Sequence, residues 1–266
     1  MTDPTNRRAL LLVLDGVGCG AAPDTAAYGD TGSDTIGNVA RAVGGLALPN
    51  LARLGLGHVA PIAGVEALAH PSGAWGTLIP RSSGKDSTTG HWELAGLHLA
   101  KPFPTYPHGF PPSVIEAFER ATGRPVMANC VASGTTVIAD FAVQARDAGA
   151  WIVYTSADSV FQIAAHEEWI PLEELYRACA IAREQLVAPH DVSRVIARPF
   201  VGTAGAWTRT ANRRDYSIQP PGVTLLDALA EAGIPRSGVG KVDDLFAGRG
   251  ITSRHTVDNA DGVSAI

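Results

Sequence analysis

Ala9-Leu10-Leu11-Leu12-Val13-Leu14 is a continuous apolar run, which Asp15 ends and the stretch Gly16-Val17-Gly18-Cys19-Gly20 follows. An uninterrupted run of this kind predicts a strand buried on both faces, as in a parallel sheet covered by helices. Ligands collect at the carboxyl ends of strands in open α/β sheets, so Asp15 is a candidate metal ligand or base. The alternative role of this carboxylate is to cap the following turn.

A second apolar stretch, Ala74 to Ile79, predicts another strand, which leads into Gly84-Lys85-Asp86-Ser87-Thr88-Thr89-Gly90-His91-Trp92-Glu93. The first seven of these ten residues lack apolar periodicity and are predicted to form a loop. Such a loop can present a hydroxyl nucleophile beside charges that bind phosphate or a metal ion. The alternative is a polar turn that enters a helix, with Ser or Thr as its N-cap. Because Asp15 and Ser87 both follow predicted strands, we expect them at the same edge of one sheet.

Composition excludes several classes of protein. The 266 residues are enough for one large or two modest domains, and the net charge of -5 argues against nucleic acid or anionic membrane as a partner. No apolar run approaches the roughly 20 residues of a membrane span, and the run before Asp15 is too short for a secretory signal. Cys19, Cys130 and Cys179 are odd in number and widely spaced, so we expect a reducing cytoplasm and no thiolate metal site.

The middle of the chain has its own α/β pattern between two proline-rich stretches, 101–112 and Pro220-Pro221-Gly222. Stop and start signals, together with β-branched and aromatic runs, set the boundaries of the expected elements. Helices are predicted over Ser113–Thr122, Val137–Ala148 and Pro171–Leu186, and strands over Val126–Ala128, Trp151–Tyr154 and Arg194–Phe200. Outside this region, helices are predicted over Thr35–Val43, just after Leu48, and over Thr224–Ala232.

Trp207 to Asp215 is dense in polar groups, including Arg209, Asn212, Arg213 and Arg214. Several guanidinium groups close together suit bidentate phosphate binding. The alternative is a solvated charged loop, which is the commoner fate of such a run.

One competing motif is present at the N-terminal end. Gly16-x-Gly18-x-x-Ala21 satisfies the dinucleotide-binding pattern after a predicted strand. Asp15 would place a negative charge against the pyrophosphate, however, and Pro23 interrupts the helix that should begin there. We therefore expect no nicotinamide nucleotide at this site.

Taken together, the motifs resemble the bacterial phosphopentomutases of the alkaline phosphatase superfamily. The matching segments follow the family's order over nearly the whole chain. They are Val13–Gly18, Gly32–Gly37, Leu48–Leu51, Ser83–Asp86, Thr89–Glu93, Tyr154–Ala164, Arg194–Phe200, Arg209-Thr210 with Asn212-Arg213, and Val239–Lys241.

The resemblance implies an α/β fold, with an incomplete alkaline-phosphatase-like core and an inserted α/β cap domain. The core would comprise residues 1–101 and 220–266, and the cap would comprise residues 102–219. The implied reaction moves phosphate between the 1- and 5-positions of ribose or 2-deoxyribose, through a phosphorylated hydroxyl and a bisphosphate intermediate. Two divalent ions, usually manganese, and a priming activator of the glucose 1,6-bisphosphate type would be the cofactors.

The resemblance also implies site residues. Ser87 occupies the phosphorylated position, where the family usually has Thr, and Thr88 is the alternative. Asp15 and Ser87 match metal-ligand positions. Ser156 and Asp158 match the contacts to the sugar hydroxyls, and Ile196 matches a substrate-lining position. The groups expected to bind the distal phosphate are Arg194, Arg209 and Lys241.

One departure from the family pattern is large. The remaining Asp and His metal ligands of the family lie in motifs that are absent from these 266 residues. We therefore expect that this chain does not complete a two-metal site and that its core sheet exposes apolar faces. The alternative to an enzyme is a non-catalytic sugar-phosphate-binding remnant.

Overall fold

The computed structural model describes residues 8–266, which divide after Pro80 into two compact units. The first unit contains the 3-10 helices η2 (Thr25–Tyr28) and η3 (Leu56–His58) and the helices α1 (Thr35–Ala42) and α2 (Pro49–Leu54). Its small core is built on Ile36, Ala40 and Ile62. Asp34 caps α1 by accepting a 3.2 Å hydrogen bond from the Gly37 N–H. The two helices lie where the capping and stop signals predicted them.

The two strands predicted in this unit are absent, and both predictions were wrong. Residues 9–14 and 74–79 have no regular secondary structure. Leu11 is 70% exposed and Leu78 is 86% exposed. A strand requires a neighbour that takes its backbone hydrogen bonds and covers its side chains. Among the described residues of this unit, β pairing is confined to the isolated bridge between Ile62 and Val65, so the apolar runs have no ladder to join.

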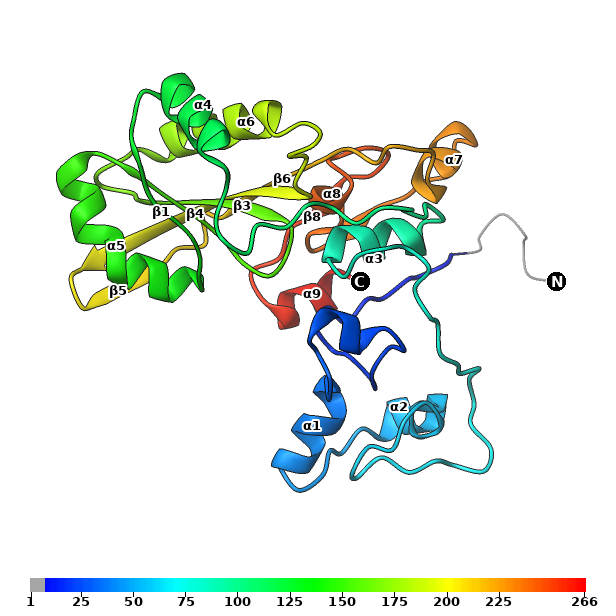
Figure 1. The fold of residues 1–266 in the computed structure, drawn as a ribbon. Helices are drawn as coiled ribbons and strands as arrows, with labels where there is room; N and C mark the ends of the chain where they lie inside the picture. Colours follow the sequence, from blue (N-terminus) through cyan, green and yellow to red (C-terminus); the bar gives the residue numbers. More distant parts are fainter. Residues whose placement is uncertain (1–7) are drawn as a thin grey trace. The chain divides into compact units, whose positions relative to one another are not determined.

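A six-stranded mixed sheet forms the centre of the second unit (Figure 1). Its strands are β1 (Val126–Val131), β2 (Trp151–Thr155), β3 (Val160–His166), β4 (Arg194–Thr203), β5 (Ala206–Arg209) and β6 (Arg214–Ser217). The order is β1-β2-β3-β4-β5, with β6 also paired to β4. The pairs β1–β2 and β3–β4 are parallel, whereas β2–β3, β4–β5 and β4–β6 are antiparallel.

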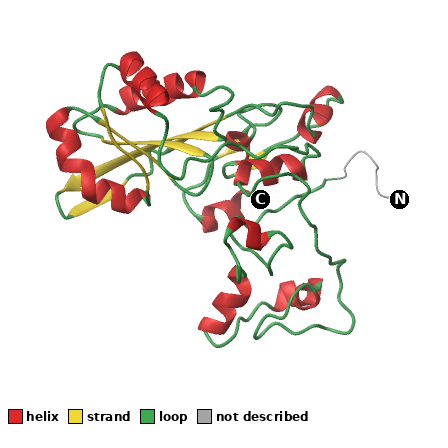
Figure 2. Ribbon diagram, viewed as in Figure 1, coloured by secondary structure: helices red, strands yellow, loops and turns green. Residues whose placement is uncertain are grey.

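Helices cover both faces of this sheet (Figure 2). Helices α4 (Pro112–Thr122) and α6 (Leu172–Gln185) lie on one face, and α5 (Gly134–Ala148) lies on the other. Phe161 and Val195 pack toward α4 and α6, whereas Ile152 and Tyr154 pack toward α5. Because both faces are covered, β2 and β3 are buried along their full length. The three helices and strands β1, β2 and β4 confirm the predicted elements, but β3 was not predicted.

The rest of the second unit consists of short elements around a separate core. These are α3 (Ser87–Leu94), α7 (Leu225–Glu231), β7 (Gly238–Val239), α8 (Val242–Leu245), β8 (Ser253–Arg254) and α9 (Asn259–Ala265). The core contains Trp92, Leu245 and Phe246. The buried Trp92 Nε1–H donates a 2.8 Å hydrogen bond to the Leu245 carbonyl oxygen. Segments that precede and follow the sheet in sequence therefore pack against each other. No helix within residues 8–266 is long and apolar enough to cross a membrane.

Candidate functional site

Polar side chains gather where β2 ends and where β3 and β4 begin. The turn between β2 and β3 carries Ser156 and Asp158, both half-buried. Ser193, just before β4, is joined to this turn because its Oγ–H donates a 2.7 Å hydrogen bond to the Ser159 carbonyl oxygen. Arg194 follows as the first residue of β4. The topology therefore brings the predicted sugar contacts and Arg194 to one edge of the sheet.

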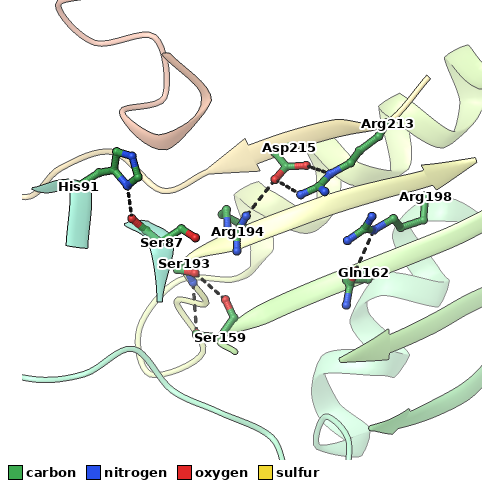
Figure 3. Close-up of polar contacts among 9 residues, drawn as sticks. All are labelled: Ser87, His91, Ser159, Gln162, Ser193, Arg194, Arg198, Arg213 and Asp215. Atoms are coloured by element: carbon green, nitrogen blue, oxygen red, sulfur yellow. Dashed lines mark hydrogen bonds and ion pairs between the residues drawn. The ribbon is translucent and has the colours of Figure 1, made fainter. Parts of the chain in front are cut away.

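Arg194 is buried and ion-paired. Its side chain is 6% exposed, and its Nη1–H donates to the Asp215 Oδ2 at 3.1 Å (Figure 3). Arg213 donates to the same carboxylate through two bonds of 2.6 Å. Burial by itself would raise the pKa of Asp215, but the hydrogen bonds and positive charges of Arg213 and Arg194 hold that pKa below its ordinary value. Asp215 is consequently ionised and fixes both guanidinium groups.

Ile196 lies on the same face of β4 as Arg194, because side chains two residues apart in a strand share a face. It is buried, and its Cα partners on the neighbouring strands are Gln162 and Asp215. Two residues further on, the Arg198 Nε–H donates to the Gln162 Oε1 at 3.0 Å. Burial lowers the pKa of Arg198, and the nearby charge of Arg213 lowers it further.

A cavity of about 460 Å³ opens beside this row of residues. Three arginines line it, Arg198, Arg209 and Arg213, together with Pro199, Trp207, Thr208 and Thr210. Arg209, the last residue of β5, was predicted to contact phosphate, and the structure places it here. Lys241 occupies the N-cap position of α8, and neither it nor Arg194 lines the cavity. Of the three residues expected at the distal phosphate, Arg209 therefore lines this cavity.

The predicted phosphate carrier, Ser87, is the first residue of α3 and not part of a loop. Asp86 caps this helix, since its Oδ1 accepts a 3.0 Å hydrogen bond from the Thr89 N–H. The alternative prediction, a polar turn that enters a helix, is confirmed for the turn and the helix. The capping residue differs, because it is Asp86 and not a Ser or Thr. Ser87 is half-buried, whereas Thr88 is 0% exposed. The structure therefore leaves the Ser87 hydroxyl as the more accessible of the two.

The two metal ligands implied by the resemblance lie in different units of the chain, Asp15 in the first and Ser87 in the second. Among residues 8–266, the one group of three or more His, Cys, Asp or Glu side chains close enough to share an ion is Asp243, Asp244 and His255. That group includes neither predicted ligand.

Sequence reasoning missed Arg198 and Gln162 as parts of this region. A signal for Arg198 was available, because Arg194-x-Ile196-x-Arg198 alternates with the period of a strand and so places the three side chains on one face. Gln162 had no such signal, because it lies in β3, a strand that was not predicted.

No protein-family model matches the chain, but curated relatives match it over nearly its whole length. The phosphopentomutase of Anaeromyxobacter dehalogenans (strain 2CP-C) is 55% identical over 263 residues, which are 98% of this chain and 67% of the relative. Those of Carboxydothermus hydrogenoformans and Thermotoga petrophila are each 55% identical over 258 residues and 66% of their own length. The chain spans about two thirds of the relatives it matches. With this identity along almost every described element, the chain belongs to the phosphopentomutase family.

Proposed function

We propose that the protein is an isomerase that moves phosphate between the 1- and 5-positions of ribose or 2-deoxyribose, with Ser87 as the phosphate carrier. The observation that carries this proposal is the placement of Ser87 at the start of α3. Its hydroxyl is the accessible one of the Ser87-Thr88 pair, in a chain of the phosphopentomutase family. Backbone N–H groups in the first turn of a helix also favour a bound phosphate.

The proposed reaction has two phosphoryl transfers. In the first, the bond between the Ser87 Oγ and phosphorus breaks as a hydroxyl oxygen of the sugar phosphate bonds to the same phosphorus. The proton of the sugar hydroxyl passes to the Ser87 Oγ, which becomes a free hydroxyl again. The product is a sugar bisphosphate. In the second, the phosphate that the sugar carried originally is transferred to the Ser87 Oγ, so its bond to the sugar oxygen breaks and that oxygen takes the serine proton. This transfer regenerates the phosphoserine and releases the isomeric sugar phosphate.

The sugar is proposed to bind at the edge of the sheet that carries the turn between β2 and β3. Ser156 and Asp158 would hydrogen-bond its hydroxyls, and Ile196 would line the site. The proposed contacts to the distal phosphate are Arg194, Arg209 and Lys241. Support comes from the shared sheet edge of Ser156, Asp158 and Arg194, and from the position of Arg209 beside a cavity.

The finer fold assignment is part of the same proposal. Residues 1–101 and 220–266 would belong to an alkaline-phosphatase-like core, and residues 102–219 would form an inserted cap. The packing of Trp92 against Leu245 and Phe246 supports this division, because it joins the two stretches that flank the insertion. The helix-covered sheet lies between them in sequence.

Phosphopentomutases require divalent metal, and manganese and a glucose 1,6-bisphosphate-type activator are the expected identities. The roles above are assigned to the side chains of the described residues alone. A divalent ion bound near a serine would lower the pKa of its hydroxyl and stabilise charge on the phosphoryl oxygens.

The test is to map the phosphate by mass spectrometry after incubating the protein with glucose 1,6-bisphosphate and Mn²⁺. We expect phosphoserine at position 87 and its loss in Ser87→Ala. Ser83→Ala is the matched control, because Ser83 lies four residues earlier and its hydroxyl donates to the Ala100 carbonyl oxygen. Phosphate carried on Thr88, or persisting in Ser87→Ala, would overturn the assignment.

A further inference from the structure

Two buried serines, Ser159 and Ser193, join the turn between β2 and β3 to the start of β4 (Figure 3). Ser193 is 0% exposed and Ser159 is 3% exposed. The Ser193 Oγ–H donates to the Ser159 carbonyl oxygen at 2.7 Å, and the Ser193 backbone N–H donates to the Ser159 Oγ at 3.3 Å. Each serine thus uses its hydroxyl to bind the backbone of the other.

These bonds extend the pairing of β3 with β4 beyond the ends of both strands. The first pair of that parallel ladder is Val160 with Arg194, so Ser159 and Ser193 are the next residues outward. The Arg194 N–H donates to the Ser159 carbonyl oxygen at 3.4 Å, which is long for a backbone hydrogen bond. The two hydroxyls therefore add contacts where backbone pairing alone is weak. They tie the position of Asp158, which immediately precedes this pair, to that of Arg194.

The Ser159 hydroxyl also binds the proline-rich stretch that precedes α4. Its Oγ–H donates a 2.5 Å hydrogen bond to the Pro104 carbonyl oxygen. Inside the turn, the Thr155 Oγ–H donates to the Val160 carbonyl oxygen, and the Val160 N–H donates to the Asp158 carbonyl oxygen. The bonds inside the turn set its shape, whereas the two serines fix it to other segments of the second unit.

Burial makes the serine hydroxyls difficult to replace. Ser193→Ala removes the shorter of the two hydrogen bonds that reach the Ser159 carbonyl oxygen. Ser159→Ala removes the hydroxyl that binds both the Ser193 N–H and the Pro104 carbonyl oxygen. A buried polar group that loses its partner is costly, so the turn would shift to reach water or another partner.

We propose that Ser159 and Ser193 are positioning residues for the sugar site, because they hold the turn that carries Ser156 and Asp158 at a fixed place beside β4. Both serines are buried and offer almost no surface to a ligand, so they act through the turn and not by contact with the sugar. The inference rests on the proposed function, which makes Ser156 and Asp158 the contacts to the sugar hydroxyls. It adds two residues that determine whether those contacts are in place before the sugar arrives.

The test is a calorimetric titration of the 266-residue chain with ribose 5-phosphate, without divalent ions, so that no transfer accompanies binding. We expect Ser193→Ala and Ser159→Ala each to weaken the affinity roughly three- to tenfold, the usual effect of one hydrogen bond. Thr122→Val is the matched control and should bind like the wild type. The Thr122 hydroxyl likewise donates one bond, to the Phe118 carbonyl oxygen, and accepts one, from the Trp151 indole N–H, but at the opposite end of β2.

A double-mutant cycle shows whether Ser193 acts through the turn. In the Asp158→Ala background, Ser193→Ala should weaken ribose 5-phosphate binding less than it does in the wild type, because a contact that it positions is already gone. Losses that simply add would overturn the positioning role.

Hydrogen exchange separates this local role from a general loss of stability. In Ser193→Ala and Ser159→Ala, the amides of residues 156–160 should exchange faster, while those in the middle of β2 and β4 should keep their wild-type rates. Weaker binding that accompanies faster exchange throughout the sheet would overturn the inference, since it would reflect unfolding of the whole region.

The outcomes also distinguish this inference from the proposed function. Wild-type affinity for ribose 5-phosphate in both serine variants overturns the positioning role and leaves the proposed function intact. A wild-type chain that binds no ribose 5-phosphate overturns the proposed sugar site, and the positioning role with it.

Discussion

Arg194 and Asp215 form an ion pair inside the sheet, with the Arg194 Nη1 and the Asp215 Oδ2 3.1 Å apart and both side chains less than a tenth exposed. The same carboxylate also holds Arg213. Removing one partner of a buried pair leaves the other charge without compensation, which is far more costly than losing an exposed pair. Asp215 is therefore expected to be essential for stability even though it contacts no proposed ligand.

Asp215→Ala should lower the free energy of unfolding by about 3–5 kcal/mol, because it leaves Arg194 buried and unpaired. Urea denaturation followed by circular dichroism measures this change. Asp147→Ala provides the control, since Asp147 pairs with Arg146 at the surface and its loss should change stability by less than about 1 kcal/mol. If the two substitutions lowered the free energy of unfolding by similar amounts, the buried ion pair would stabilise the protein no more than the exposed one.

The same carboxylate predicts a dependence on pH. Its pKa is lower in the folded protein than the value of about 3.9 expected in the unfolded chain. Its contribution to stability is therefore fully present above the unfolded-state pKa and is lost as the pH falls through the folded-state pKa. The difference in unfolding free energy between wild type and Asp215→Asn, measured from pH 6 to pH 3, should be constant above the unfolded-state pKa and narrow below it. A gap that stays constant across this range would contradict the prediction.

Thr88→Val should keep or raise the stability of the protein, because the Thr88 hydroxyl is buried and has no hydrogen-bond partner among the described residues. Valine has nearly the shape of threonine and removes the unsatisfied group, so a gain of up to about 1 kcal/mol is expected. The variant should also still form phosphoenzyme on Ser87. Thermal unfolding together with phosphate mapping checks both points, and loss of phosphoenzyme in a stable variant would return Thr88 to consideration.

Asp158→Ala should weaken the binding of pentose phosphate roughly tenfold while leaving phosphorylation of Ser87 by the activator largely intact. The reason is its position in the turn between β2 and β3, where it is proposed to contact the sugar and not the carrier. Asp140→Ala, an exposed position on α5, serves as the control and should change neither quantity. Equal losses of binding and of phosphoenzyme in Asp158→Ala would argue against a role as a sugar contact.

The three cysteines should differ in reactivity. Cys179 is fully buried, and burial strongly raises the pKa of its thiol, whereas Cys19 and Cys130 are only half-buried. Titration with a thiol reagent should label Cys19 and Cys130 in the folded protein and Cys179 only after unfolding. Rapid labelling of Cys179 under native conditions would show that the α6 packing opens readily.

The sheet region was predictable because its signals are local. Each helix there has a clear start or stop, such as Gly123 after α4 and Gly149 after α5, and the strands β2 and β4 are rich in β-branched and aromatic residues. The apolar runs at 9–14 and 74–79 carried an equally strong strand signal. They failed because an apolar run specifies burial, whereas a strand also needs a neighbouring strand, which the sequence pattern does not contain.

The candidate site was predictable only in part, for a related reason. The residues at the turn between β2 and β3 follow from the positions of the strand ends. The cavity lined by Arg198, Arg209 and Arg213 depends on how three separate segments meet. The pattern within any one of these segments does not predict that the three arginines lie around one cavity.

The hydrogen bond between Trp92 and Leu245 has a consequence for the kinetics of folding. It joins residues 153 positions apart, so a random chain would lose considerable loop entropy in forming it early. The sheet between these two residues has its own apolar cores and can form first. Its formation shortens the disordered chain between Trp92 and Leu245 before their hydrogen bond forms. We therefore expect the tryptophan to reach its native environment in a late, slow phase, after the strands have paired.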